Sequence, residues 1–366
     1  MDTDLLYKIA MTKIPLVGAI TAKNLISYCG GVQAVFETKK KALLRIPGVG
    51  ETVAKHILQQ KSLGLAEQEM NLMEHRDMHA LFYLDDHYPN RLKHFANSPV
   101  LLYYQGNADL NHARMVSIVG TRKPTSRGLA VCESLIAGLQ EYDVVIVSGL
   151  AYGIDVAAHK ESLALGIDTI GVLGHGLDRI YPAQHRKVAK EMTTQGGLLT
   201  EYGIGTQPDR EHFPMRNRII AGLCDALIVV ETARKGGSMI TVEIANSYQK
   251  DVFAVPGRLG DKYAVGCNHA IKCHKAALLE SAEDIAYIMR WDRAAQAQAQ
   301  QQKLFVELSA AEQSILNLMG TQEEITIDQL LFGAKMSASQ LAGILLSLEF
   351  KAKLKVLPGK RFLLLR

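Results

Sequence analysis

Cysteine is scarce in this sequence. Five cysteines occur among 366 residues, and no two of them are spaced as Cys-x-x-Cys. An odd and scattered set argues against a disulfide framework and for a reducing compartment. Cys267, His269, Cys273 and His274 follow one another closely, but their spacing fits no common zinc arrangement. We therefore expect neither disulfides nor a metal site.

Long hydrophobic runs and a strong excess of one charge are also lacking. No apolar run approaches the length that spans a bilayer, and the first ten residues resemble no secretory signal. The 41 basic and 37 acidic residues give a net charge of +4, which excludes a histone-like or polyacidic chain. We expect a soluble, cytoplasmic protein whose binding site is local.

Several familiar catalytic and nucleotide-binding motifs are missing. The sequence has no Gly-x4-Gly-Lys-Ser/Thr string and no Gly-x-Gly-x-x-Gly after the first strand of the expected sheet, which disfavours a classical ATPase or an NAD enzyme. Ser148, Asp155 and His159 lie close in sequence, but no Gly-x-Ser-x-Gly elbow accompanies them. We therefore do not expect a hydrolase triad.

The length and the 48% hydrophobic content suffice for two or three domains with full cores. A stretch rich in Ala and Gln is too poor in large apolar residues to fold alone, and it predicts a linker at 294–303. We expect a helix-hairpin-helix domain at 1–75, a Rossmann-like domain at 76–293 and a winged-helix-like domain at 304–366.

The central region contains short apolar, β-branched runs, most of them followed by a helical stretch. These runs end near Val119, Val147, Leu173, Thr200, Val230 and Val255. Runs that alternate with helices predict a mostly parallel sheet covered on both faces. The fold class is therefore α/β, with a doubly wound, Rossmann-like sheet.

Ligands of open α/β sheets bind at the carboxyl ends of the strands, so the loops after these runs are the candidate site. In the loop after the first run, Gly120 lets a backbone come close, Thr121 and Ser126 offer hydroxyls, and Arg122 and Arg127 offer forked charge. With the free N–H groups of the next helix, these residues predict a phosphate cradle.

Other loops of the same edge add further candidates. Asp155 can cap a helix or touch a ligand, and the glycine-rich loop at 231–238 opens onto another helix. Phe213 can stack on a base, while Arg216 and Arg218 can pair with phosphate in bidentate fashion. A single glycine-rich loop is often only a tight turn, but the set together favours an anion site.

Both flanking regions show patterns found in DNA-binding modules. Pro47-Gly48-Val49-Gly50 between two helical stretches resembles a helix-hairpin-helix turn, which can hold a nucleic-acid phosphate or a protein. In an upstream copy Leu16 replaces the first glycine, so we expect that copy to pack rather than bind.

The C-terminal region shows the order of a small winged helix. Its expected recognition helix, 337–348, has no Lys or Arg, so a protein partner is as plausible there as duplex DNA. A basic wing favours DNA, and its residues are Lys351, Lys353, Lys355, Lys360 and Arg361.

The chain resembles the bacterial DNA-processing protein A (DprA/Smf) family over nearly its whole length. The phrases that carry the resemblance are Ser117–Arg122, Ser148–Asp155 with Ala158-His159, Gly176-Leu177-Asp178 with Tyr181-Pro182, Phe213-Pro214 with Arg216–Arg218, and Phe253–Gly257. The resemblance implies a single-stranded DNA-binding dimer, without enzymatic turnover or cofactor, that takes up DNA during natural transformation and loads the RecA recombinase onto it.

The resemblance also implies which residues contact DNA. They are Gly120, Thr121, Arg122, Ser148, Gly149, Phe213, Arg216, Asn217, Arg218, Lys235, Gly236, Gly237 and Ser238. The chain departs from the family pattern at Gly236, where a serine is usual, and at His185, where asparagine is expected. Neither departure removes a charge from the site.

Two alternatives remain open. Gly236-Gly237 followed by Thr241 and Glu243 comes near the Gly-Gly-x-x-Thr-x-x-Glu loop of nucleoside-monophosphate phosphoribohydrolases, with one residue too many before the threonine. Glu243 would then be a catalytic carboxylate rather than an ordinary helix residue. A pure scaffold that joins recombination proteins would instead bind no bare oligonucleotide.

Overall fold

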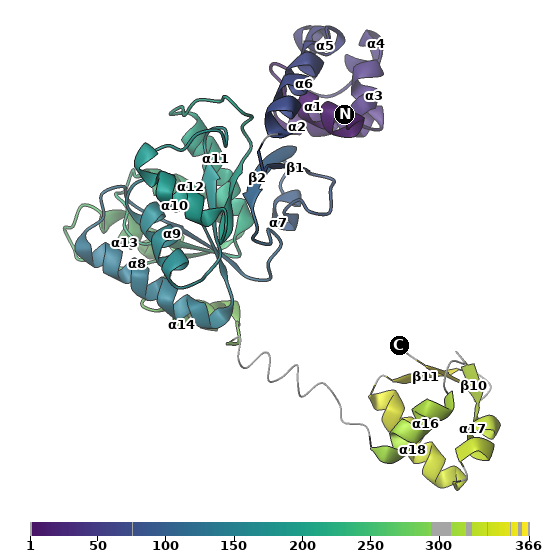
Figure 1. Cartoon of the computed structure of the whole chain (residues 1–366). Helices are drawn as coiled ribbons and strands as arrows, with labels where there is room; N and C mark the ends of the chain where they lie inside the picture. The colour runs from purple at the N-terminus through teal and green to yellow at the C-terminus, as the bar shows by residue number, and fades with distance from the viewer. Residues whose placement is uncertain are drawn as a thin grey trace. The chain divides into compact units, whose positions relative to one another are not determined.

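The computed structural model describes residues 2–74, 76–293, 309–319, 324–334, 336–351, 353–357 and 361–364. The chain forms two compact units, residues 1–294 and 295–366, which we describe separately (Figure 1). The linker expected at 294–303 lies outside the described residues. The domain boundaries within the chain therefore stay predictions.

The first unit is built around a mixed sheet, which in the described part has nine strands. They are β1 (His79–Phe82), β2 (Leu101–Gly106), β3 (Met115–Val119), β4 (Val145–Ser148), β5 (Thr169–Leu173), β6 (Gly196–Thr200), β7 (Ala226–Val229), β8 (Asp251–Ala254) and β9 (Ala277–Leu278). Their order is β1-β2-β6-β5-β4-β3-β7-β8-β9. The strands from β6 to β9 are parallel, and β1 and β2 are antiparallel additions.

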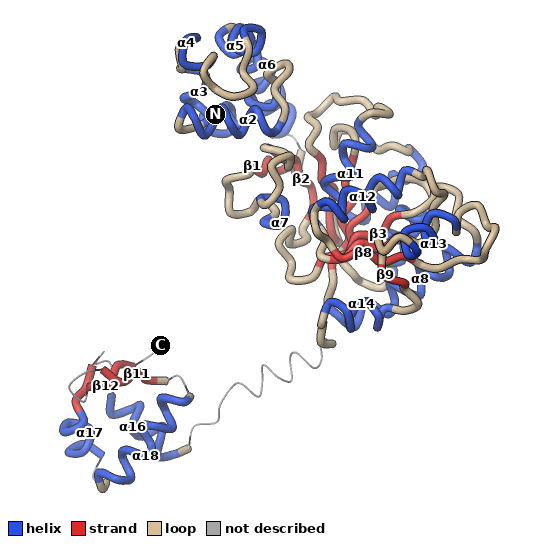
Figure 2. Tube along the Cα trace, turned by 180° about the vertical axis from the view of Figure 1, so that it is seen from behind, coloured by secondary structure: helices blue, strands red, loops and turns tan. Residues whose placement is uncertain are grey.

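Helices cover both faces of the sheet, as Figure 2 shows from behind. They are α8 (Ser126–Leu139), α9 (Ile154–Ala164), α10 (Arg186–Met192), α11 (His212–Leu223), α12 (Gly237–Ser247), α13 (Val265–Lys272) and α14 (Ala282–Met289). Alternate side chains of β3 enter two separate cores: Val116 and Ile118 pack with α8 and α14, while Met115 and Val119 pack with α11, α12 and α13. The predicted doubly wound α/β fold is confirmed.

The order of the strands places a topological switch at β3. From β3 the chain proceeds through β4, β5 and β6 on one side and returns to β7 on the other. The loops after β3 and β7 therefore leave neighbouring strand ends in opposite directions. A crevice forms at such a point, and ligands of open α/β sheets bind there.

The N-terminal part consists of helices α1 (Thr3–Thr12), α2 (Ala19–Cys29), α3 (Val32–Glu37), α4 (Lys40–Leu43), α5 (Glu51–Leu58) and α6 (Lys61–Glu74). The turn between α4 and α5 lies at the predicted hairpin, with Gly48 at φ +84°. In the upstream copy Leu16 adopts a similar left-handed conformation, φ 64°, and its side chain is 74% exposed. The tip of this copy is therefore exposed, while Ile14 and Leu25 on either side of it lie in the core.

Buried polar contacts fix these helices to the sheet domain. The Glu69 carboxylate on α6 is 4% exposed, forms an ion pair with Lys13 and accepts a 3.0 Å hydrogen bond from the amide of Ile204, beyond β6. The ammonium group of Lys23 donates to the carbonyl of Phe95 at 3.1 Å and to the hydroxyl of Ser98 at 2.7 Å. Desolvation lowers the pKa of Lys23 to about 8.

The second unit contains α16 (Ala310–Met319), β10 (Glu324–Thr326), α17 (Ile327–Ala334), α18 (Ala338–Phe350), β11 (Leu354–Leu357) and β12 (Arg361–Leu364). The strands form an antiparallel sheet in the order β10-β12-β11, and Ile315, Leu341 and Leu348 contribute to the core beside it. This arrangement confirms the predicted winged helix. Of the basic wing, Lys351 is paired with Glu312 at 2.7 Å, and Lys360 lies outside the described residues.

Glu69→Ala is expected to destabilise the first unit. The substitution leaves the Lys13 ammonium and the Ile204 amide without their buried acceptor, which costs about 2–4 kcal/mol of unfolding free energy. Equilibrium denaturation with urea measures the change. Glu67→Ala, on the exposed face of the same helix, is the control and should change stability by less than about 0.5 kcal/mol.

Candidate nucleic-acid interface

A groove of about 690 Å³ opens at the switch point, where β3 and β7 end. The loop after β3, the first turns of α11 and α12, and the loop after β7 form its walls. Nine of the predicted contact residues line it: Gly120, Thr121, Arg122, Phe213, Arg216, Asn217, Gly236, Gly237 and Ser238. The other four, Ser148, Gly149, Arg218 and Lys235, do not appear in its lining.

Arg122 supplies an available positive charge at this groove. Its side chain is exposed, and we find no ion pair for it within the described residues. The guanidinium lies 5.8 Å from the centre of the Phe213 ring, and that ring lies 6.0 Å from the ring of Tyr181. These three side chains also line a small adjoining pocket of about 60 Å³. A cation and aromatic faces therefore stand together at the groove.

Arg216 belongs to the floor of the groove. Its side chain is 5% exposed and donates to the carbonyl of Val172 and to the amide oxygen of Asn217, the latter at 3.3 Å. A Cβ atom placed on Gly149 would lie 2.5 Å from the Asp155 carboxylate and 2.7 Å from the Arg216 guanidinium, so both groups enclose this glycine. Gly149 is therefore required for packing beneath the groove.

Burial shifts the pKa values of this acidic and basic pair. Desolvation raises the pKa of Asp155 to about 6, and the nearby positive charge of Arg216 opposes that shift. Desolvation also lowers the pKa of Arg216 to about 10, with Asp155 opposing the shift. The guanidinium stays charged at neutral pH. Asp155 lies near Arg216 beside Gly149, in the first turn of α9, and the N-cap of that helix is Gly153.

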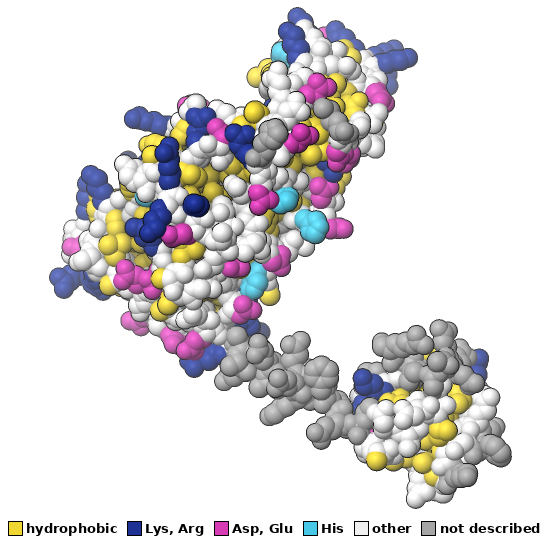
Figure 3. Space-filling view, viewed as in Figure 1, with side chains coloured by type: hydrophobic (Ala, Val, Ile, Leu, Met, Phe, Trp, Pro, Cys, Tyr) yellow, Lys and Arg dark blue, Asp and Glu magenta, His cyan; other side chains and the backbone are white. Residues whose placement is uncertain are grey.

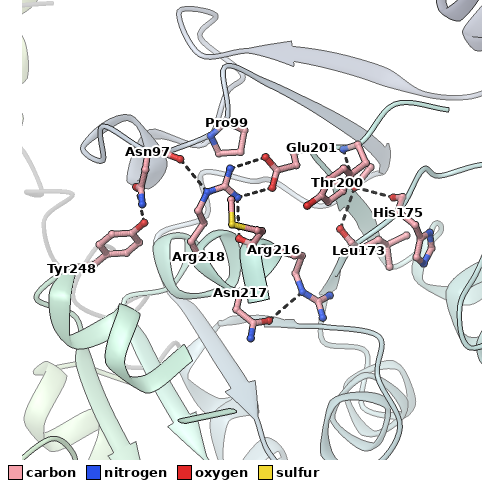
Figure 4. Close-up of polar contacts among 12 residues, drawn as sticks. Asn97, Pro99, Leu173, His175, Thr200, Glu201, Arg216, Asn217, Arg218 and Tyr248 are labelled. Atoms are coloured by element: carbon pink, nitrogen blue, oxygen red, sulfur yellow. Dashed lines mark hydrogen bonds and ion pairs between the residues drawn. The ribbon is translucent and has the colours of Figure 1, made fainter. Parts of the chain in front are cut away.

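Arg218 points away from the groove. Its two terminal nitrogens contact both carboxylate oxygens of Glu201 at 2.5 and 2.6 Å, and its Nε donates to the carbonyl of Asn97 at 3.0 Å. Figure 4 shows Arg218 between Glu201 and Asn97, while Arg216 lies on the other side of the helix turn beside Asn217. The sequence predicted a phosphate as the bidentate partner of Arg218. In the structure that partner is the carboxylate of Glu201.

The residues of the predicted phosphate cradle do not line one site. Thr121 and Arg122 line the groove at the switch point, whereas Arg127 lines a separate groove. Thr125 caps α8 by accepting from the amide of Gly128, and the Glu231 carboxylate accepts from the amide and hydroxyl of Thr125 at 2.9 and 2.6 Å. An internal anion thus occupies the helix start that the sequence offered to phosphate. A Cβ on Gly120 would clash with Ile154, so this glycine allows close side-chain packing rather than the approach of a ligand backbone.

The start of α12 remains open to the groove. A Cβ on Gly237 would meet no atom within 4 Å, so the backbone there is accessible. Ser238 is buried, and its hydroxyl donates to the hydroxyl of Thr232 at 2.7 Å. The first amides of a helix have no intrahelical acceptor and favour anions. Lys235 lies exposed in the loop just before this helix.

Ser148 and His159 do not form a nucleophile and base. The Ser148 hydroxyl is fully buried and donates to the carbonyl of Ile118 at 2.5 Å. His159 Nε2 donates to the carbonyl of Gly149 at 2.7 Å, and its Nδ1 lies 2.7 Å from the Thr169 hydroxyl. Burial lowers the pKa of His159 to about 4, so the imidazole is neutral and structural.

The alternative catalytic carboxylate, Glu243, also lies outside the groove. Its side chain is 53% exposed and forms a 2.6 Å ion pair with Lys275. In the part of the chain that the structure describes, no cluster of three His, Cys, Asp or Glu side chains suits a metal ion. The described helices also include none long and apolar enough to cross a membrane.

Sequence reasoning missed Arg210 and Tyr263, which also line the groove, as does Thr232 of the predicted loop at 231–238. Arg210 stands three positions before Phe213, and its positive charge beside that predicted contact residue could have identified it. Tyr263 lies in the loop that follows β8, and nothing local distinguishes it from other surface tyrosines. Only the fold brings that loop against the end of β7, where the Thr232 amide donates to the Tyr263 carbonyl at 2.7 Å.

The fold and this groove define a Rossmann-like protein with a cationic, partly aromatic groove at the carboxyl edge of its sheet. The family model of the DNA recombination-mediator protein A matches residues 79–290, and that of the DprA winged helix domain matches residues 294–360. The chain belongs to the DNA recombination-mediator protein A family.

Curated relatives agree with this assignment. The DNA processing protein DprA of Streptococcus pneumoniae is 46% identical over 202 residues, which cover 55% of this chain and 71% of that protein. Protein Smf of Synechocystis is 35% identical over 269 residues, which cover 72% of this chain and 68% of that protein.

Two solved structures are also similar to this chain. The X-ray structure of DNA processing protein A from Streptococcus pneumoniae has a TM-score of 0.68 and 35% identity, and it covers 78% of this chain and 98% of that one. A structure of DNA processing protein A from Helicobacter pylori, described for its single-stranded DNA binding mode, has a TM-score of 0.54 and 29% identity. It covers 60% of this chain and 99% of that one.

Asp155→Asn is expected to change how stability depends on pH. The folded pKa of Asp155, about 6, exceeds its ordinary value of 3.8, so its contribution is fully present below pH 3.8 and is lost as the pH rises through 6. The stability of the wild type relative to the variant should fall by about 2 kcal/mol between about pH 4.5 and 7. Urea denaturation of both proteins at both pH values measures the change. A stability difference between wild type and variant that is the same at both pH values would contradict the raised pKa of Asp155.

Proposed function

We propose that this protein binds single-stranded DNA in the sheet-edge groove and breaks no bond in it. The observation that carries the proposal is the meeting of Arg122, the Phe213 ring and the open start of α12 in one groove. Guanidinium and backbone amides suit phosphate oxygens, and an aromatic face accepts an unstacked base. The relative from Helicobacter pylori whose structure describes a single-stranded DNA binding mode supports it.

The surface around the groove supports a largely sequence-independent mode. Figure 3 shows several Lys and Arg side chains, with apolar surface between them, on one face of the first unit. Backbone contacts carry no sequence information, and stacking tolerates every base. A groove that offers a ring to a base face requires exposed bases, so duplex DNA should bind less tightly.

We assign the phosphate contacts to Arg122, Thr121 and the start of α12, and the stacking contact to Phe213. Arg216 acts from the floor as a buried positive charge. Ser148 and Gly149 hold the floor together, and Arg218 braces α11 through Glu201. The groove therefore depends on fewer direct contacts than the family resemblance implies.

The absence of turnover is part of the same proposal. The neutral, fully bonded His159 and the paired Glu243 support it, because neither is poised to activate water or a substrate. We further propose that the protein acts as a cytoplasmic homodimer during natural transformation and recombination, where it protects incoming DNA and loads RecA onto it. The family membership supports these roles.

Arg122→Ala should weaken the binding of oligo-dT and reduce its dependence on salt. Loss of one phosphate contact lowers the slope of log affinity against log salt by about 0.7 for a single strand. Fluorescence anisotropy at two or more salt concentrations measures the slope. Arg293→Ala is the control, because Arg293 is already paired with Glu141 at 3.0 Å. An unchanged slope in Arg122→Ala would contradict the assigned contact.

Incubation with AMP distinguishes the enzymatic alternative. A phosphoribohydrolase releases free adenine, whereas the proposed binding protein should release none above a control without protein. Liquid chromatography of the products makes the comparison. Adenine production that disappears in Glu243→Gln would overturn the proposal of a non-catalytic protein.

A further inference from the structure

A second groove, of about 380 Å³, continues from the first at Tyr263, which lines both. Three cations lie along it: Arg127 in the first turn of α8, and Arg258 and Lys262 in the loop between β8 and α13. All three side chains are exposed. The ion pairs found in the described part of the chain include none of them.

The loop that carries two of these cations is held at both ends. The Gly257 amide donates to the side-chain oxygen of Asn268 at 3.0 Å, and the side-chain amide of Asn268 donates back to the Gly257 carbonyl at 2.9 Å. At the other end, the Thr232 amide donates to Tyr263 and the Gly266 amide donates to Thr232 at 2.9 Å. The loop is thus preorganised against the exit of β7, which lowers the entropic cost of binding.

The chemistry of this second groove suits an extended polynucleotide better than a small free anion. Val131, Val255 and Pro256 line it beside the cations, and the carboxylates of Glu231 and Asp261 lie there as well. Glu231 is engaged by Thr125 and faces the start of α8, which partly offsets its charge. Apolar walls with cations beside them accommodate bases and sugars in the groove while phosphates reach the cations.

The opposite end of the sheet-edge groove is a weaker route for a strand. There Pro214 leads to a groove lined by Met215, Ile244 and Tyr248. The arginine that lines this groove is Arg218, and its guanidinium is already paired with the carboxylate of Glu201. Available charge therefore favours the end at Tyr263.

We propose that the groove of Arg127, Arg258 and Lys262 is a second subsite, which holds the nucleotides that continue past Tyr263 from the sheet-edge groove. This inference rests on the proposed single-strand binding and deepens it. A strand that fills both grooves contacts more phosphates than one confined to the first. Long oligonucleotides should therefore gain affinity and salt dependence that short ones lack.

Titrations of the full chain with oligo-dT of about 6 and about 20 nucleotides test the subsite. The double variant Arg258→Ala/Lys262→Ala should bind the short oligonucleotide within about twofold of the wild type. Its affinity for the long one should fall about tenfold, and its salt slope for the long one should fall by about 1.4, which is two contacts at about 0.7 each. Lys272→Ala/Arg293→Ala removes two positive charges elsewhere and should bind both lengths as the wild type does.

Three outcomes would overturn the subsite. The double variant would bind both lengths like the wild type, it would lose both equally, or the matched control would lose the long oligonucleotide to the same extent. Each of these leaves wild-type binding intact and so spares the proposed function. A wild type that binds neither length would remove the proposed function and the subsite together. Thermal unfolding of the variants, expected to match the wild type, verifies that they are folded.

Discussion

The burial of Arg216 against Asp155 is the interaction on which the groove depends. It connects α11, α9 and the strand end at Gly149, and it places a positive charge under the crevice where β3 and β7 diverge. A buried charge without an opposite charge nearby is strongly destabilising, so removal of either residue would weaken this floor. The proposed contacts, the exposed Arg122 and the half-buried Phe213, lie above this floor. Their geometry is set before a ligand arrives, which reduces the ordering that binding requires.

The fold could be predicted from sequence because strand and helix patterns are local. The parallel strands, the turn at Gly48 and the order of the winged helix all lie where short-range periodicity indicated. The antiparallel strand β2 was not predicted, although Leu101–Tyr104 is apolar throughout, because an uninterrupted apolar run does not reveal its direction or its neighbours. Strand β9, with two residues, is too short to give a pattern.

The site was only partly predictable, since a sequence shows residue types but not their partners. Arg216 and Arg218 look alike in the chain, yet one lies under the groove and the other is bound by Glu201. Glu231 fills the helix start at Thr125 from 106 positions away. The carboxylates of Glu201 and Glu231 thus bind groups for which the sequence predicted a phosphate. The contrast between paired and unpaired cations, visible only in three dimensions, also directs attention to Arg258 and Lys262.

The two margins of the sheet limit how other chains can associate with it. A β-sheet grows when an incoming segment pairs with the free peptide groups of an outer strand. At one margin β9 offers only two residues, and at the other the Lys8 ammonium of α1 lies 5.1 Å from the ring of Phe82 in β1. Neither margin is a good template for main-chain pairing. Association through this sheet domain is therefore favoured at side chains on its helices and loops, where recognition can be selective and reversible.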